Sequence, residues 1–62
     1  MPVITIKLYE GRTREQKAEL AKRITDDVVE TVGSSRDHVW IFFEDAKKSD
    51  HAIAGELQDA QS

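Results

Sequence analysis

Two runs of bulky apolar residues, with a helical pattern between them, predict the order strand, helix, strand. Residues 3–9 (VITIKLY) are rich in β-branched and aromatic residues and polar only at Thr5 and Lys7, which is typical of a strand. The run His38 to Phe43 (HVWIFF) predicts a second strand on the same grounds. Between the two runs, apolar residues recur with the helical period and form one face, made of Leu20, Ala21, Ile24, Val28 and Val32.

Both ends of the predicted helix carry sequence signals. Thr13, followed three residues later by Gln16, matches the capping box, in which the threonine caps the helix and the glutamine reaches back to the cap amide. The helix continues to about Val32, and Gly33 supplies the left-handed residue that ends it. Residues 34–37 then connect the helix to the second strand.

A strand, a helix and a strand in this order form a β-α-β unit with parallel strands. One helix covers only one face of a two-stranded sheet. The other face needs a partner, and a second copy of the chain is the simplest one. We expect the uncovered face to carry some of Val3, Thr5, Lys7, Tyr9, Trp40 and Phe42.

The segment from Ala46 to Ser62 is mostly polar, and its one compact apolar insert is HAIAG at residues 51–55. A short hairpin over Asp50–Gly55 that packs on a neighbouring subunit would explain apolar residues amid charge, and we predict disorder for the last few residues. A loosely ordered end is the alternative. The predicted fold class is α/β, with residues 1–62 forming a single domain.

The composition narrows the classes of function. A chain of 62 residues is marginal as an independent domain. It has no cysteine and therefore no disulfides, so we expect self-association. The two histidines lack ligand-like spacing, so no metal is expected. Nine basic and twelve acidic residues give a formal net charge of −3, which argues against a nucleic-acid surface. With neither a membrane-spanning run nor a secretory leader, a cytoplasmic protein is the expectation.

Pro2 is the first candidate for chemistry because it follows the initiator methionine. Removal of Met1 leaves a secondary amine at the new terminus, and a reference α-amino group titrates at about 7.7–8.0. Desolvation and nearby cations lower that pKa further, so Pro2 could act as a base near neutral pH. The plainer interpretation is that the proline only begins a strand. If Met1 stays attached, the nitrogen is an amide and cannot be a base.

Arg12 follows the first strand, at the edge of the sheet where ligands of α/β proteins collect. Its guanidinium can hold a carboxylate through two hydrogen bonds, and a solvated turn arginine near Glu10 is the alternative. His51 is a candidate acid or base, or simply exposed, and Trp40 is a candidate core or interface residue. The sequence has no glycine-rich phosphate loop, nucleophile elbow or zinc signature.

These features together resemble the 4-oxalocrotonate tautomerase family. The resemblance rests on Pro2, on residues 8–13 (LYEGRT) and 15–17 (EQK), and on residues 52–57 (AIAGEL). It runs essentially from end to end. It implies a β-α-β subunit assembled as dimers, three of which form a hexamer. It also implies a cofactor-free tautomerase that interconverts the enol and keto forms of an unsaturated 2-oxo acid.

By this resemblance Pro2 is the catalytic base and then acid, and Arg12 binds the substrate carboxylate and draws electron density. The pocket is expected to be walled by Tyr9, Trp40, His51 and Ile53. Two positions depart from the family. In the best-studied enzyme of the family the second strand carries a polarising arginine where Trp40 stands here, and the late hairpin has a phenylalanine where His51 stands. Losing that cation should raise the pKa of the amine unless Trp40 excludes water. His51 or Arg36 is a candidate to take over the polarising role.

The leading hypothesis is a tautomerase that acts on a small unsaturated 2-oxo acid and needs no cofactor, nucleic acid or membrane. The first alternative is a non-catalytic oligomeric module on the same scaffold. The second is a superfamily hydratase, dehalogenase or decarboxylase, for which Asp50 is the one carboxylate of the late loop that could activate water.

Overall fold

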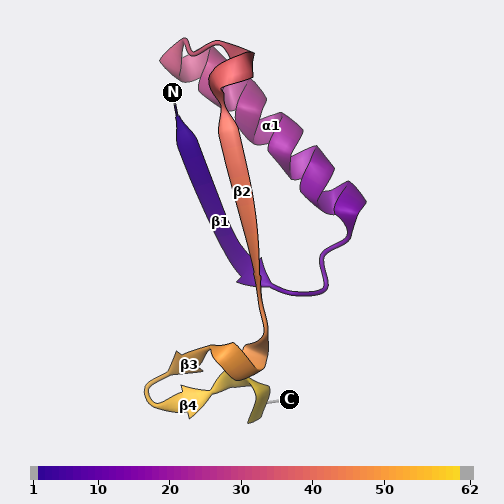
Figure 1. Cartoon of the computed structure of the whole chain (residues 1–62), viewed down its shortest axis with the longest axis vertical. Coiled ribbons are helices and arrows are strands. Elements are labelled where there is room, and N and C mark those ends of the chain that lie inside the picture. Colours follow the sequence, from indigo (N-terminus) through magenta and orange to yellow (C-terminus); the bar gives the residue numbers. More distant parts are fainter. Residues whose placement is uncertain (1, 61–62) are drawn as a thin grey trace.

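The protein, seen here as a computed structural model, is described over residues 2–60 and has the predicted β-α-β unit followed by a hairpin. Its elements are β1 (Val3–Tyr9), α1 (Arg14–Val32), η1 (Arg36–His38), β2 (Trp40–Ala46), η2 (Lys48–Asp50), β3 (Ala52–Ile53), β4 (Glu56–Leu57) and η3 (Gln58–Ala60), where η marks a single 3₁₀ turn. Figure 1 shows α1 beside the β1–β2 sheet, and the β3–β4 hairpin beyond the end of the sheet that lies opposite the start of β1.

The two long strands are parallel, as predicted. Their register runs from Val3 opposite Trp40 to Tyr9 opposite Ala46. The ladder extends by one bond at each end, because the Trp40 amide donates to the Pro2 carbonyl at 3.1 Å and the Glu10 amide donates to the Ala46 carbonyl at 3.0 Å. The start of β1 and the start of β2 therefore share one edge of the sheet, and their carboxyl ends share the other.

The bounds of the second strand differ from the prediction. His38 belongs to η1, which its own backbone hydrogen bond closes, so the strand starts two residues later. The strand also runs on through Glu44 and Asp45. These charged residues continue the ladder opposite Lys7 and Leu8. Their carboxylates also have partners: Lys7 lies 3.6 Å from Glu44, and Lys17 of α1 lies 2.8 Å from Asp45.

Both predicted caps of α1 are confirmed. The Thr13 hydroxyl accepts a hydrogen bond from the Gln16 amide at 3.1 Å, and the Gln16 side chain accepts one from the Thr13 amide at 2.9 Å. At the other end Gly33 has φ 80°, in the left-handed region, and its amide donates to the Val29 carbonyl. Within residues 2–60 no helix, α1 included, has the length and apolarity that crossing a bilayer requires.

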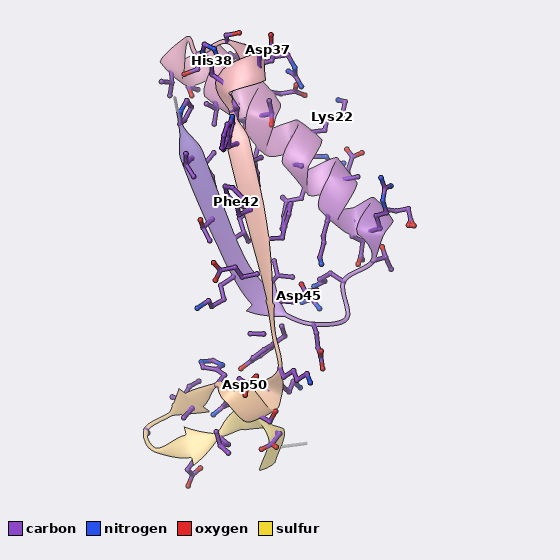
Figure 2. The ribbon with its side chains drawn as sticks, in the orientation of Figure 1. Lys22, Asp37, His38, Phe42, Asp45 and Asp50 are labelled. Carbon is purple, nitrogen blue, oxygen red and sulfur yellow. The ribbon has the colours of Figure 1, made fainter. Side chains whose placement is uncertain are left out.

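One face of the sheet lies toward α1 and the other is open. The residues on the helix side are half-buried: Ile4, Ile6, Leu8, Ile41 and Phe43. On the open side Val3, Trp40 and Phe42 keep 57%, 48% and 50% of their surface exposed. The rings of Trp40 and Phe42 meet edge to face, with centroids 6.4 Å apart. Figure 2 labels Phe42 on β2.

The apolar face of α1 is only partly covered. Ala21, Ile24 and Val28 are half-buried, as their helical spacing predicts, whereas Leu20 and Val32 are exposed. The sheet has only two strands and is too narrow to cover the whole face. None of residues 2–59 is fully buried.

The dimensions of the chain agree with this lack of a core. Its radius of gyration is 14.9 Å and its extents are 43 × 24 × 14 Å. A compact domain of this length has a radius of gyration of about 11 Å. The accessible surface is 4926 Å², against about 4,000 Å² for a compact protein of this mass. An isolated subunit therefore exposes apolar surface that a stable fold would cover.

The predicted hairpin is present but starts later than Asp50–Gly55. Asp50 ends the 3₁₀ turn η2, and β3 and β4 flank a two-residue turn at Ala54 and Gly55, with φ 54° and 84°. Positive φ at both positions is the geometry of the tight turns that match the twist of a hairpin. Residues 58–60 form η3 rather than a disordered end. The disorder predicted for residues 61 and 62 falls outside the described residues.

An ion pair joins α1 to the connector that follows it. Arg36 donates from Nη1 to Asp26 Oδ1 at 2.6 Å, and Lys22 lies 3.4 Å from the other oxygen of the same carboxylate. The hydrogen bond from Arg36, helped by Lys22, holds the pKa of Asp26 below its ordinary value. Arg36, a sequence candidate for a role in catalysis, is thus engaged in holding the connector against the helix.

We predict that Arg36→Gln raises the pKa of Asp26 toward the ordinary aspartate value of about 3.9, as measured by NMR titration of its carboxyl carbon. Because the pKa is lowered in the folded state, the pair stabilises the fold above that value and loses its effect as pH falls through the folded-state pKa. The difference in unfolding free energy between wild type and variant should therefore vanish in acid. Arg23→Gln, which breaks the pair of Arg23 with Glu19, should leave Asp26 unchanged. An unchanged titration in Arg36→Gln would contradict the assignment.

Candidate active site

The carboxyl end of the sheet brings together two residues that the sequence marked as pocket residues. The Tyr9 hydroxyl and His51 Nδ1 share a hydrogen bond of 2.5 Å, and their rings lie 5.3 Å apart. Both residues line a hollow of about 430 Å³. Its remaining lining comes from the ends of β1 and β2: Lys7, Leu8 and Ala46.

Local backbone structure explains why His51 faces Tyr9. After β2 the turn η2 is closed by a hydrogen bond from the Asp50 amide to the Lys47 carbonyl at 2.8 Å, which reverses the chain. The His51 carbonyl then accepts from the Gln58 amide at 2.9 Å, which ties the entry of the hairpin to its exit. His51 is therefore held from both sides, and it is half-buried.

Tyr9 has a second contact at the same end. The Lys48 ammonium lies 5.6 Å from the centre of the Tyr9 ring, within the range of a cation–π interaction. Tyr9 also borders a second hollow of about 350 Å³, lined by residues of η2 and by Glu10 and Asp59. The phenol ring thus separates two hollows, and its hydroxyl is bound to the histidine of the first.

Arg12 lies in the loop between β1 and α1, three residues beyond Tyr9. It is exposed and forms no ion pair with any residue in the described range 2–60, so a single chain is equally consistent with the alternative of a solvated turn arginine. Gly11, with φ 114°, turns the chain just before it, and the helix cap follows just after it. The loop is thus fixed at both ends while the guanidinium remains available.

Ile53 lies on β3 with 56% of its surface exposed and does not line the hollow beside His51. Its predicted place in the pocket wall is therefore not formed within one chain. An exposed apolar side chain at the tip of a hairpin is suited to contact another subunit. The role of Ile53 stays a prediction.

Pro2 and Trp40 lie at the opposite end of the sheet from Tyr9 and His51. Pro2 is half-buried and accepts the backbone hydrogen bond of Trp40. Seven steps of extended chain separate Pro2 from Tyr9, which is about 23 Å. In Figure 2, His38 lies at the end of the sheet where β2 starts, and Asp50 lies near the hairpin, beyond the other end. One chain therefore does not bring Pro2 and Trp40 to the other predicted site residues.

The unpaired basic residues are not evenly distributed. Five of the nine Lys and Arg side chains form ion pairs. Within residues 2–60 the four without an ion-pair partner all belong to segments that follow the carboxyl ends of β1 and β2: Arg12, Arg14, Lys47 and Lys48. Acidic residues, among them Glu10 and Asp50, lie in the same segments. This end of the sheet therefore has the cations that are available for an anionic ligand.

A metal centre finds no support in the described part of the chain. No three side chains among its histidines, aspartates and glutamates lie close enough together to hold an ion. Pro2 and His51, two of the sequence candidates for general acid or base chemistry, lie at opposite ends of the sheet. The Tyr9–His51 contact itself was not predicted. Alternation along β1 puts Lys7 and Tyr9 on the same face, but no sequence signal places His51 opposite them.

Comparison with known proteins gives a consistent result. The family model described as tautomerase enzyme matches residues 2–61. The 2-hydroxymuconate tautomerase of Bacillus subtilis (strain 168) is 44% identical over 55 residues, which span 89% of each chain. Among solved structures, YwhB, described as a homologue of 4-oxalocrotonate tautomerase, has a TM-score of 0.92 at 38% identity, covering 98% of this chain and 100% of that one. A 4-oxalocrotonate tautomerase isozyme from Methylibium petroleiphilum has a TM-score of 0.84 at 34% identity, covering 95% of each.

Proposed function

The chain belongs to the tautomerase family, and from this we propose that it is a cofactor-independent tautomerase that interconverts the enol and keto forms of an unsaturated 2-oxo acid. Pro2, exposed by removal of Met1, is the general base and then the acid. Arg12 binds the substrate carboxylate. The observation that carries the proposal is that the family match begins at Pro2 and includes the loop of Arg12.

The proposed reaction needs only one proton carrier. In the enol-to-keto direction the Pro2 nitrogen takes the proton of the enol hydroxyl. The electron pair of the O–H bond stays on the oxygen, and the product is a dienolate. A carbon of the dienolate then takes the proton back from the prolinium, which forms the C–H bond and the C=O bond and restores the amine. A base with a pKa near ambient pH serves both steps.

The proposed site is built from more than one subunit. Pro2 and Arg12 lie at opposite ends of one β1 strand, about 23 Å or more apart, and a small 2-oxo acid cannot span that distance. A second copy that places its Arg12 end beside the Pro2 end of the first removes the difficulty. The open, apolar face of the sheet gives a reason for such copies to associate.

This assembly would also lower the pKa of the Pro2 amine. Val3, Trp40 and Phe42 surround the start of the sheet with apolar surface, and covering that surface with a neighbour removes water from around Pro2. Desolvation disfavours the charged amine and lowers its pKa. Trp40, which stands where the best-studied enzyme of the family has an arginine, would act here through the exclusion of water rather than through charge.

We predict that Pro2→Ala lowers kcat/KM on 2-hydroxymuconate or phenylenolpyruvate by about 10²-fold or more, because it replaces the ring amine that acts as base. The rate is measured by ultraviolet absorbance on protein whose intact mass shows that Met1 is absent. Ala18→Ser, at an exposed position of α1, is the control. Equal rates for wild type and Pro2→Ala would reject the tautomerase mechanism, and full retention of Met1 in cells would favour a non-catalytic module.

A mixing experiment tests the shared site. Arg12→Ala and Pro2→Ala are each expected to be nearly inactive. When the two are unfolded and refolded together, about a quarter of the sites should receive an intact Pro2 from one chain and an intact Arg12 from another. Activity should therefore return toward one quarter of the wild-type value. Each variant refolded alone is the control. A mixture that stays at the mean of its two parents would show that one chain supplies both residues.

We predict that Phe42→Asp dissociates the assembly and abolishes activity together with it, because association would bury an unpaired carboxylate on the sheet face. Light scattering coupled to size-exclusion chromatography gives the mass, and circular dichroism checks the secondary structure. Ala18→Asp adds the same charge at an exposed helix position and should remain associated. A Phe42→Asp protein that keeps the wild-type mass would exclude this face from the interface.

A further inference from the structure

His51 has one ring nitrogen engaged and one available. Nδ1 is bound to the Tyr9 hydroxyl, and Nε2 forms no hydrogen bond with any residue of the described chain. The ring lines the hollow of about 430 Å³ at the carboxyl end of the sheet. A half-buried imidazole with a free nitrogen beside a hollow can offer that nitrogen to a ligand.

The direction of the hydrogen bond with Tyr9 determines whether Nε2 is a donor or an acceptor. A neutral imidazole has one N–H donor and one acceptor nitrogen, and the partner of one nitrogen sets the state of the other. The Tyr9 hydroxyl carries a single proton, and within residues 2–60 its one hydrogen-bond partner is His51 Nδ1. With the phenol as donor and Nδ1 as acceptor, the ring proton is on Nε2, so the free nitrogen is a donor.

Tyr9 is itself well placed to hold this arrangement. Its backbone lies in the β1–β2 ladder opposite Ala46, and Lys48 contacts its ring. The hydroxyl is thus carried on a fixed strand, whereas His51 comes from the turn before the hairpin. The strand therefore orients the histidine.

We infer that Tyr9 fixes the tautomer of His51, and that His51 Nε2–H donates a hydrogen bond to the 2-oxygen of the substrate. The inference rests on the proposed tautomerase function. When Pro2 of a neighbouring copy takes the enol proton, negative charge remains on the 2-oxygen of the dienolate. No proton leaves His51, which stabilises that charge through its hydrogen bond alone. Tyr9 is a positioning residue in this scheme.

The first test reads the tautomer without any assay of activity. In the assembled wild-type protein at neutral pH, long-range proton–nitrogen NMR of labelled histidine should show His51 protonated at Nε2 and unprotonated at Nδ1. His38, which is exposed on η1, is the internal reference. Tyr9→Phe should return His51 to a mixture of tautomers. A proton on Nδ1 of the neutral wild-type ring would overturn the inference, whether or not the protein is an enzyme.

The second test separates the two ring nitrogens by isosteric replacement. The amide of Gln places an N–H near the position of Nε2, whereas the amide of Asn reaches only the position of Nδ1. His51→Gln should therefore keep kcat within about tenfold of wild type, and His51→Asn and His51→Phe should lose about 10²-fold, as when a donor to a developing oxyanion is removed. The loss should fall on kcat rather than KM, because the charge develops in the transition state.

The outcomes distinguish the two proposals. If wild type is active and Pro2→Ala is not, but the three His51 variants all match wild type, the tautomerase function stands and the role of His51 is rejected. Equal losses in Gln and Asn variants would also reject it, because they would indicate a structural role. If wild type has no activity on 2-oxo acids while NMR shows the Nε2–H tautomer, the proposed function fails and the Tyr9–His51 pair remains as a structural fact.

Discussion

The structure depends on one constraint: a two-stranded sheet has two faces, and this chain supplies one helix. That helix half-covers Ile4, Ile6 and Phe43, while Val3, Trp40 and Phe42 stay about half exposed. Completing the burial of one large apolar side chain that is already half covered contributes roughly 1 kcal/mol. None of residues 2–59 is fully buried within one subunit, so contacts with a second copy would add burial that one subunit cannot supply.

The same geometry divides the chemistry between the two ends of the sheet. One end holds the Pro2–Trp40 ladder bond and apolar side chains. The other holds the Tyr9–His51 hydrogen bond, the loop of Arg12 and the unpaired lysines of the η2 segment. In a parallel pair all strand starts share one edge, so no change of register within one chain can join these groups. The proposed catalysis therefore requires association, which would also cover the open apolar face of the sheet.

Sequence predicted the local features of this fold well. The caps of α1 depend on residues three or four apart, Thr13 with Gln16 and Gly33 with Val29, and each was predicted at its position. The bounds of β2 were not, because His38 closes the turn η1 and because Glu44 and Asp45 continue the ladder opposite Lys7 and Leu8, which lie far away in the sequence. The Tyr9–His51 bond joins positions 42 residues apart. Composition and periodicity carry no information on a contact of that range. The sequence could therefore propose candidate site residues, but it could not predict which of them contact one another.

Trp40 lies at the Pro2 end of the sheet, where it can affect the pKa of the amine. A cation beside Pro2 would lower the pKa of the amine by repulsion, and a tryptophan can do so only by excluding water. Arg36, the basic residue nearest to Trp40 along the chain, is held by Asp26 on the side of α1. The Pro2 end therefore offers desolvation, and the cations and the His51 donor that an anionic intermediate needs lie at the other end. The Pro2 end lacks cations and a hydrogen-bond donor, and the carboxyl end lacks the amine base. An assembly that brings the two ends together would create a site whose base is neutral and whose oxyanion is stabilised.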